Sequence, residues 1–393
     1  MLHKTPDQRG DFQVRLIDSL SEFGDIKVAW LSLERSNEQP GFFQSYAWCG
    51  HVAEIMTRTY PKSYAPLVAV AARDGEVVAI WPLSRQKRSG LWQLRSLDDP
   101  FGQFSGVLAH DPVDVQFLTR ETLDIVRNRR LAAAVRMEFV ISGSPFEAAL
   151  SACGASVRGE VGAPYIDVRQ TPTFEGLKSS RNKKTMKNLR NANNRLAKAG
   201  AHEHRVAIGD ERAAEIIKTT LRRRMTWLED KGLTAPQFRS AAHAEILTGG
   251  LPRGLDKARV SFELLCDGKA IAQQWGFLHQ KRYYAFMSAV DPSAVHLSPG
   301  RLHLAFVIAG AMRFGVVGIE LLTPASPYKM VWTDHARRLR DMAMPLSVAG
   351  RLHDIVWERT VRPLLKAGFY AMPASLRRHA SPKEASNAHA EIE

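Results

Sequence analysis

The chain contains the same arrangement of segments twice. Residues 67–83 (LVAVAARDGEVVAIWPL) and 260–277 (VSFELLCDGKAIAQQWGF) each consist of two alternating apolar runs joined by Asp-Gly. Asp-Gly between alternating runs is a strong sequence signal for a β-hairpin. Each hairpin is followed by Gln-Lys-Arg, a helical stretch, a strand and then Ser-Pro-aromatic. This shared order predicts two α/β lobes, each with a mixed sheet, that arose from one duplicated module.

Composition agrees with a two-domain globular chain. The length of 393 residues suits two domains of ordinary size, and 45% hydrophobic residues are enough for real cores. The start lacks the apolar stretch of a signal peptide, and no apolar run approaches the ~18 residues that a spanning helix needs. The three cysteines are odd in number and widely spaced, which favours neither disulfides nor a zinc cluster. We therefore expect a cytoplasmic protein, with contact to the inner membrane at most peripheral.

The order of elements predicts four regions. Residues 1–170 form the first lobe, which we expect to be non-catalytic, and residues 171–345 form the catalytic lobe. Basic amphipathic helices are expected over 346–380, and the last residues, 381–393, have the composition of a disordered tail.

One helix in the second lobe is strongly basic. Its expected range is 178–200, with Ser179 or Ser180 as the N-cap, and residues 181–198 contain seven Lys or Arg and no acid. Such a face can recruit a phosphorylated small molecule, anionic lipid or nucleic acid, but it can equally be a solvated surface. The candidate acceptor-binding residues on it are Lys183, Lys184, Lys187 and Arg190.

A second candidate site lies where a strand is followed by a helix, at 291–302. Ser298, Pro299 and Gly300 precede the helix, and proline favours a helix start while glycine lets a ligand approach the backbone. The free N–H groups of a helix start bind phosphates, and Arg301 would add a charged contact. An ordinary proline-capped helix is the alternative.

These segments together resemble the GNAT acyltransferase superfamily, and more narrowly its duplicated CelD-like branch, which is related to the FemAB transferases. The resemblance is carried by FFQSYAW (42–48), SRNKKTMKNLR (180–190), GKAIAQQWGF (268–277), AVDP (289–292), SPGRL (298–302) and YKMVW (328–332). It implies tandem GNAT-like lobes of the acyl-CoA N-acyltransferase type. It also implies an acyl-CoA donor, acetyl-CoA foremost, held at residues 298–301, and a carbonyl polarised by a backbone N–H of strand 282–290.

The loop before the helix departs from the GNAT pattern of Gln or Arg, two residues, Gly, one residue, then Gly or Ala. Val295 stands in the first slot and Ser298 in the first glycine slot, so that only Gly300 fits. Backbone donors survive these changes, but the departure weakens the prediction of CoA binding. It keeps open a Fem-like transferase that uses aminoacyl-tRNA.

Two carboxylates are candidates for the base that removes a proton from the acceptor. Glu320 lies within the apolar strand GIELL, where burial would raise its pKa, although a strand residue that faces solvent is the alternative. Asp291 precedes Pro292 and is either a base or a turn residue.

Four more residues complete the candidate site. By the resemblance, Tyr328 would protonate the leaving thiolate and Lys329 would bind an anionic group. Gln274 and Tyr284 lie on strands that would line the cleft, where one of Tyr283 and Tyr284 is expected to face the cleft and the other the core. His202 and His204 have no further ligand at metal-binding spacing, so we predict no metal.

The sequence therefore predicts transfer of an acyl group, acetyl foremost, to an amine or hydroxyl. The expected acceptor is a saccharide or an envelope precursor, anionic or phosphorylated if the basic helix binds it. Aminoacyl transfer from tRNA is the first alternative. The second is a non-enzymatic basic adaptor for nucleic acid or anionic membrane, which the net charge of +14 favours.

Overall fold

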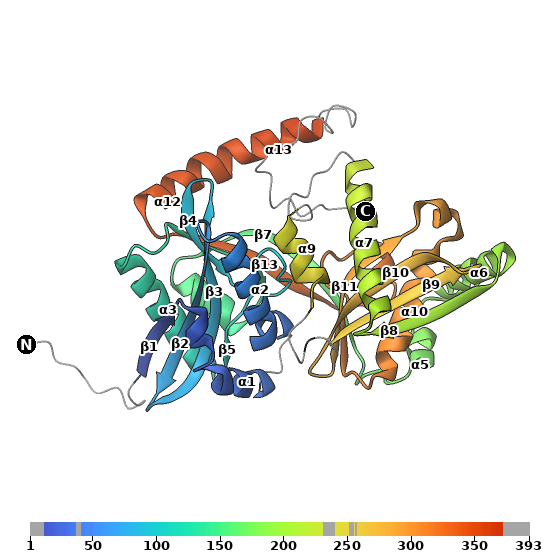
Figure 1. The fold of residues 1–393 in the computed structure, drawn as a ribbon, viewed down its shortest axis with the longest axis horizontal. Helices are drawn as coiled ribbons and strands as arrows, with labels where there is room; N and C mark the ends of the chain where they lie inside the picture. The colour runs from blue at the N-terminus through green and yellow to red at the C-terminus, as the bar shows by residue number, and fades with distance from the viewer. Residues whose placement is uncertain (1–11, 37–40, 231–239, 251–254, 256–257, 372–393) are drawn as a thin grey trace, which may run out of the picture. The chain divides into compact units, whose positions relative to one another are not determined.

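The computed structural model describes residues 12–36, 41–230, 240–250, 255 and 258–371. The chain divides into two compact units, one formed by Met1–Glu160 with Leu339–Pro363 and the other by Val161–Arg338 with Leu364–Glu393 (Figure 1). The lobe boundaries at 170/171 and 345/346 stay a prediction about the duplicated modules.

The first unit is built on a mixed sheet in the order β1-β2-β3-β4-β6-β13. Neighbouring strands are antiparallel except β4 and β6, which are parallel. The strands are β1 (Phe12–Ile17), β2 (Tyr64–Arg73), β3 (Glu76–Arg88), β4 (Leu91–Ser96), β6 (Ala134–Ile141) and β13 (Ala336–Pro345); the short β5 (Leu108–Ala109) pairs with β3.

The second unit repeats this plan with the order β7-β12-β11-β10-β9-β8. Here β11 and β12 are the parallel pair, and the other neighbours are antiparallel. The strands are β7 (Ser156–Asp167), β8 (His202–Ile208), β9 (Arg259–Cys266), β10 (Lys269–His279), β11 (Arg282–Val290) and β12 (Gly318–Glu320). The predicted mixed α/β fold with duplicated lobes is confirmed.

Both predicted hairpins are present, β2–β3 and β9–β10. Their turns are Asp74-Gly75, with φ of 52° and 84°, and Asp267-Gly268, with φ of 47° and 78°. Two successive positive φ values define the turn that matches the twist of a hairpin, and Asp-Gly adopts it at low cost.

The two modules exchange their last strands. β7 follows the first module along the chain, yet its residues 165–167 pair with β12 of the second unit. β13 follows the second module, and its residues 339–345 pair with β6 of the first unit. Each sheet is therefore completed by a strand that the other module supplies.

Helices cover both faces of the first sheet. Val68 and Val70 of β2 pack with α1 (Lys27–Ser36) and α2 (Tyr46–Thr59), while Leu67 and Ala69 pack on the opposite face with α3 (Pro112–Asn128) and α4 (Pro145–Ala152). The sequence offers Asp111 and Asp114 as possible caps of α3. The helix begins at the earlier of the two, because Asp111 is the N-cap and Pro112 occupies the first turn.

In the second unit, α10 (Pro299–Arg313) packs on one face of the sheet, with Phe262 of β9 and Tyr283 of β11. Thr220 of α7 (Glu211–Asp230) accepts a hydrogen bond from the Trp275 indole of β10 at 2.9 Å. α9 (Ala241–Thr248) also belongs to this unit, and a 3₁₀ turn, η3 (Pro292–Leu297), leads into α10.

The basic helix expected over 178–200 is two helices, α5 (Phe174–Ser179) and α6 (Lys183–Ala199). The side chain of Asn182 accepts a hydrogen bond from the Lys184 N–H at 2.8 Å, which caps a new helix. Asn182, rather than Ser179 or Ser180, is thus the N-cap of the basic helix.

The predicted C-terminal helices are present as α12 (Val348–His353), a π-helical segment η4 (Asp354–Val361) and α13 (Arg362–Ala371). The rest of the predicted helical region, 372–380, and the predicted disordered tail, 381–393, lie outside the described residues.

Candidate functional site

The start of α10 has the backbone shape of an anion-binding loop, although its sequence departs from the glycine pattern. Ser298 adopts φ 57° and ψ 44°, the left-handed conformation that glycine prefers. Pro299 follows in the first turn, and a Cβ at Gly300 would lie 3.3 Å from Val290 Cγ2. The left-handed residue of this loop is therefore the serine, and Gly300 provides space.

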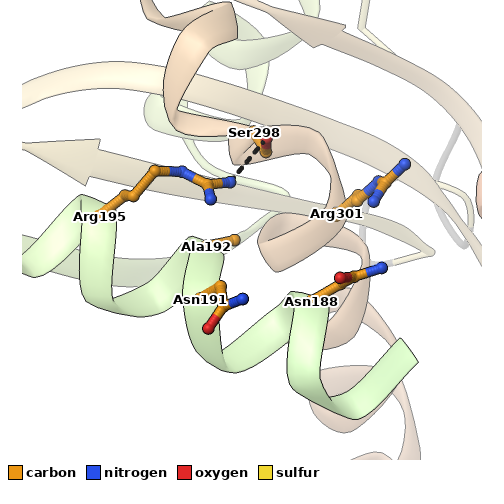
Figure 2. Close-up of a pocket in the computed structure, with 6 residues that line it drawn as sticks. All are labelled: Asn188, Asn191, Ala192, Arg195, Ser298 and Arg301. Carbon is orange, nitrogen blue, oxygen red and sulfur yellow. Dashed lines mark hydrogen bonds between the residues drawn. The ribbon is translucent and has the colours of Figure 1, made fainter. Parts of the chain in front are cut away.

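A polar cavity of about 220 Å³ lies at this helix start (Figure 2). It is lined by Asn188, Asn191, Ala192 and Arg195 of α6 and by Ser298 and Arg301 of α10. The Arg195 guanidinium donates a hydrogen bond to Ser298 Oγ at 3.1 Å. Two guanidiniums, two amides and the N-terminal end of a helix together form a site that favours an anion.

Sequence reasoning placed Ser298 and Arg301 here but missed the contribution of α6. The four α6 residues are spaced i, i+3, i+4 and i+7, the pattern of one helix face, and this spacing was the available signal. The lysines that sequence reasoning selected, Lys183, Lys184 and Lys187, are exposed, and they do not line the cavity; neither does Arg190.

The pairing of β11 with β12 is short. β11 pairs with β12 only from Arg282, opposite Gly318, to Tyr284, opposite Glu320. β11 continues to pair with β10 as far as Val290. At the same place β10 and β11 approach closely, because a Cβ on Gly276 would lie 1.9 Å from the Tyr284 carbonyl oxygen. β11 thus leaves β12 after Tyr284 and leads, through η3, to the start of α10.

In the first unit, the position beside β6 at which β4 no longer pairs with it is occupied by another segment of the chain. β4 pairs with β6 only at Gln93 and Leu94. Farther along β6, the Ser105 N–H donates to the Phe139 carbonyl oxygen at 3.0 Å, and Ser105 bridges to Val140.

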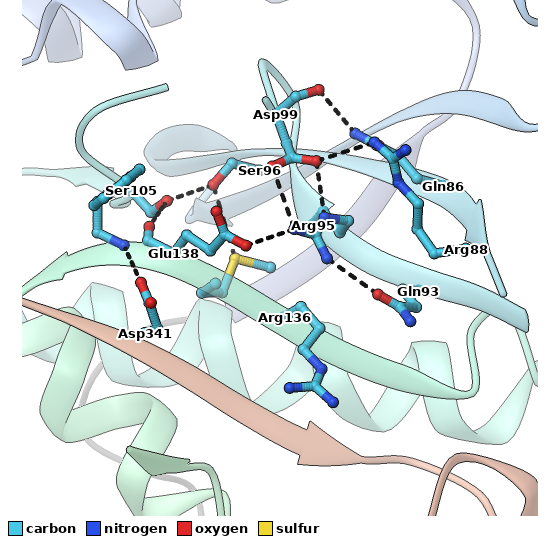
Figure 3. A network of polar contacts seen from close by, with 12 residues as sticks. Gln86, Arg88, Gln93, Arg95, Ser96, Asp99, Ser105, Arg136, Glu138 and Asp341 are labelled. Atoms are coloured by element: carbon cyan, nitrogen blue, oxygen red, sulfur yellow. Dashed lines mark hydrogen bonds and ion pairs between the residues drawn. The ribbon is translucent and has the colours of Figure 1, made fainter. Parts of the chain in front are cut away.

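A polar network stabilises this filled position (Figure 3). Arg95 donates to Asp99 at 2.8 Å and to Glu138 at 2.9 Å. The Ser105 and Ser96 hydroxyls lie 2.6 Å apart. These contacts hold the segment after β4 against β6.

Glu320 is fully buried, but its surroundings are charged rather than apolar. Arg282 Nη1 donates to Oε1 at 3.1 Å, while Arg337 Nη2 donates to Oε1 at 3.2 Å and Arg337 Nε to Oε2 at 3.3 Å. Our expectation of an apolar environment for Glu320 was wrong. Both arginines are distant from Glu320 in sequence, so the apolar segment around Glu320 did not indicate them. The Glu320 carboxylate is thus part of a buried ion-pair cluster with two arginines.

Asp291 is held in a turn. Its carboxylate accepts hydrogen bonds from the Ser293 N–H at 2.9 Å and hydroxyl at 2.7 Å, and Lys269 Nζ lies 3.0 Å away. The Ser293 hydrogen bonds, with Lys269, lower the pKa of Asp291 to about 2. Arg223 Nη2 also lies 3.4 Å from this carboxylate. A group with so low a pKa is a weak base near neutral pH.

Tyr328 and Lys329 lie together on the short helix α11 (Pro327–Met330). Tyr328 is 38% exposed, and burial around its hydroxyl raises the pKa, so that the phenol stays protonated at neutral pH. Lys329 Nζ donates to the carbonyl oxygens of Leu322, Thr323 and Pro324 at 3.0, 3.2 and 3.1 Å. Burial, with the nearby Arg224, lowers the pKa of Lys329 to about 8.

The remaining candidates are strand residues. Gln274 is 7% exposed and lies opposite Ser288 in the β10–β11 register. Tyr284 lies opposite Glu320 in the β11–β12 register. Tyr283 and Tyr284 are both almost fully buried, so the expectation that one of them faces an open cleft was wrong. A Cβ on Gly276 would lie 2.9 Å from the Tyr283 hydroxyl, so the glycine leaves room for the Tyr283 ring.

Across the described ranges, no three His, Cys, Asp or Glu side chains are grouped so that they could hold a metal ion. None of the helices within the described part of the chain is both long and apolar enough to cross a bilayer.

Comparison with known proteins agrees with this geometry. Residues 183–330 match the family described as Acetyltransferase (GNAT) domain. No curated protein is significantly similar to the chain in sequence. Among solved structures, FemX is similar with a TM-score of 0.57 at 13% identity, covering 84% of this chain and 98% of FemX.

Two further structures share the fold. A tandem GNAT protein from the clavulanic acid biosynthesis pathway has a TM-score of 0.50 at 12% identity, covering 85% of this chain and 99% of its own. The C-terminal domain of a protein named as a lysylphosphatidylglycerol synthetase, from Agrobacterium fabrum, has a TM-score of 0.50 at 10% identity, covering 84% and 93%. Residues 183–330 are thus a GNAT acetyltransferase domain, the chain is an enzyme of the acyltransferase type, and its fold is shared with FemX and with a tandem GNAT protein.

Proposed function

We propose that this GNAT-fold acyltransferase moves an acyl group, acetyl foremost, from acyl-CoA to an amine or hydroxyl of a saccharide or envelope-precursor acceptor. The observation that carries the proposal is the polar cavity at the start of α10, the helix that follows β11, the strand that leaves β12 after Tyr284. An acyl-CoA has a pyrophosphate at one end and a thioester at the other. An anion site and a strand that parts from its neighbour within one unit suit these two ends.

The donor phosphates would be held by the N–H groups at the start of α10, with Arg301 and Arg195 as charged contacts. Ser298 supports this assignment, because its left-handed backbone reproduces the loop shape without the usual glycine. The thioester would lie along β11, where a backbone N–H polarises the carbonyl.

In the reaction, the acceptor nitrogen or oxygen attacks the thioester carbon, the C–S bond breaks, and the thiolate needs a proton. Tyr328 is proposed to supply it, since its raised pKa keeps the phenol protonated. Glu320 and Asp291 stay our hypotheses for the base that accepts the acceptor's proton. Their ion pairs, however, favour structural roles for both.

Isothermal titration with acetyl-CoA tests the donor assignment, with two variants at one position. Gly300→Asp should abolish binding, because a carboxylate would face the phosphates. Gly300→Asn is the matched control: it adds a side chain of nearly the same size without charge, so binding should be weakened far less than in Gly300→Asp. Normal binding by Gly300→Asp would place the donor elsewhere.

Aminoacyl transfer from tRNA is the second candidate. The similarity to FemX and the departures from the GNAT loop support it. Titrating the protein with aminoacylated tRNA beside acetyl-CoA separates the two donors. Binding of tRNA without any acetyl-CoA signal would replace the first proposal, whereas salt-sensitive binding of every polyanion alike would favour the adaptor hypothesis.

We also propose peripheral contact with an anionic membrane. Val348, Leu352, Ile355 and Val356 are 78%, 59%, 49% and 55% exposed along α12 and η4. Residues 346–380 contain six Lys or Arg and two acids. An apolar stripe with basic flanks suits an anionic bilayer surface.

Co-sedimentation with vesicles tests this contact. Phosphatidylglycerol vesicles should retain the protein and phosphatidylcholine vesicles should not. Leu352→Asp should release it without loss of stability, because the side chain is exposed. Equal binding by wild type and variant would exclude this stripe as the contact.

A further inference from the structure

Three consecutive arginines in α7 have three different environments. Arg222 is exposed and donates one long hydrogen bond, 3.4 Å, to the hydroxyl of Thr219. Arg223 is held by several acceptors, among them the Ala270 carbonyl oxygen at 2.8 Å. Arg224 is half-buried, and its guanidinium carbon lies 4.7 Å from the centre of the Trp227 ring.

Among the described residues, Arg224 has no acidic partner. Within the described part of the chain, no hydrogen bond or ion pair engages its guanidinium, in contrast to Arg223. Its electrostatic neighbours are the Tyr328 phenol and the Lys329 ammonium. A guanidinium taken partly out of water beside a second cation is costly unless an anion joins it.

Stacking on Trp227 explains how the group is kept in place without an ion pair. The ring face attracts the cation and holds it close to the ring. The edges of the fork, which carry the five N–H donors, stay available for a planar or tetrahedral anion. Arg224 is thus held in place but not neutralised.

We infer that Arg224 binds an anionic group, phosphate or carboxylate, that the acceptor substrate carries near its accepting atom. The inference rests on the proposed function, because it places the acceptor beside Tyr328, the proposed acid. The donor does not account for the site: its phosphates are assigned to the cavity at Arg301 and Arg195, and the pantetheine arm separates them from the thioester. The acceptor is then the molecule whose anion can lie beside Tyr328.

A binding experiment tests the anion site without any acyl transfer. Inorganic phosphate and sodium acetate are titrated calorimetrically at low ionic strength into the Arg301→Gln protein, in which the donor cavity is weakened. Adding Arg224→Gln should lower the affinity for the anion that binds, phosphate or acetate, by about 10- to 100-fold. This is the effect of losing a charged bidentate contact. Adding Arg222→Gln, the matched control, should change nothing.

The two anions distinguish a phosphate site from a carboxylate site. Arg224→Lys should restore part of the affinity, which separates lost charge from misfolding. The inference would be overturned if neither anion binds, or if Arg222→Gln and Arg224→Gln weaken binding equally.

A kinetic experiment tests that the anion belongs to the acceptor. With acetyl-CoA as donor, CoA release is measured with glucosamine and glucosamine 6-phosphate as acceptors. If the site selects phosphate, the wild type should prefer the phosphorylated sugar in kcat/KM by about tenfold or more, and Arg224→Gln should lose that preference with KM for acetyl-CoA unchanged.

Equal use of both sugars by a phosphate-binding wild type would overturn the acceptor assignment. Absence of CoA release with either sugar would count against the proposed function, and the calorimetric result would still decide whether Arg224 binds anions.

Discussion

Replacing Glu320 by glutamine separates a structural carboxylate from a catalytic base. The change keeps the side-chain volume but removes the charge that Arg282 and Arg337 share. It also turns one acceptor oxygen into an amide that faces guanidinium donors. We expect Glu320→Gln to lower the stability of the protein and to leave the chemistry of each folded molecule nearly unchanged.

The size of the effect follows from burial. Breaking a buried ion pair costs about 3–5 kcal/mol. The two arginines keep 15% and 18% of their side chains exposed, so water can recover part of the loss. The lower end, about 3 kcal/mol, is therefore expected. For a unit of this size it corresponds to a fall in Tm of about 6–12 °C.

A matched control is available on another strand of the same unit. Glu263 on β9 is also fully buried, accepts two hydrogen bonds from Arg212 and lies 3.4 Å from Gln273 Nε2. Glu263→Gln should lower Tm by a similar amount. Both variants should keep kcat within about threefold of wild type at a temperature well below their Tm.

Calorimetric melts and initial rates of CoA release measure the two quantities. A base in proton transfer contributes about 10²- to 10⁴-fold to the rate. If Glu320→Gln melts within about 2 °C of wild type and loses activity on that scale, while Glu263→Gln stays active, then Glu320 is the base and the argument from its ion pairs fails.

Three other predictions concern charge, titration and packing. A variant that combines Lys183→Glu, Lys184→Glu and Lys187→Glu reverses the three exposed lysines at the start of α6. It should raise KM for the acceptor and reduce the salt dependence of that KM, with KM for acetyl-CoA unchanged. An unchanged salt dependence would show that this face is only a solvated surface. Burial lowers the pKa of His303 from 6.5 to about 3. Between these two pH values the unfolded chain binds a proton that the folded chain does not, so the free energy of unfolding should fall as pH falls, by up to about 1.4 kcal/mol per pH unit. Urea unfolding at pH 7.5 and at pH 5 measures this free energy, and His303→Phe should reduce its dependence on pH. Gly310→Ala would place a methyl carbon 2.5 Å from the Phe262 ring, which should cost about 1–3 kcal/mol in urea unfolding, whereas a neutral or positive change would show that α10 can shift.

The parts of the fold that depend on neighbouring residues could be predicted from the sequence. Asp74-Gly75 and Asp267-Gly268 form hairpins because the turn conformation is a property of two adjacent residues. The start of α10 was predictable for the same reason, since Pro299 acts on its own backbone. The break before α6 is a close case, because Asn182 competes with two serines for the role of cap.

The parts that depend on distant residues could not be predicted. The exchange of β7 and β13 is decided by pairing between segments that are far apart in the chain, and both strands have the composition of ordinary edge or central strands. The environment of Glu320 depends on Arg282 and Arg337 in the same way. Arg224 gave no signal, because nothing in a run of three arginines tells which one has no ion pair with the described residues.

Comparison of the two units leads to a prediction about stoichiometry. In the second unit, β11 leaves β12 after Tyr284, and the start of α10 follows with its polar cavity. In the first unit, Ser105 occupies the equivalent place beside β6, and Arg95 fixes the segment with two carboxylates.

A donor could enter the first unit only by displacing Ser105 and breaking a buried ion-pair network, which would cost several kcal/mol before any contact with CoA formed. We therefore expect one acetyl-CoA per chain by calorimetry, and no remaining binding in Gly300→Asp. Two equivalent sites in wild type, or one site left in Gly300→Asp, would contradict this expectation. Either result would show that the segment around Ser105 can move away from β6 to admit a donor.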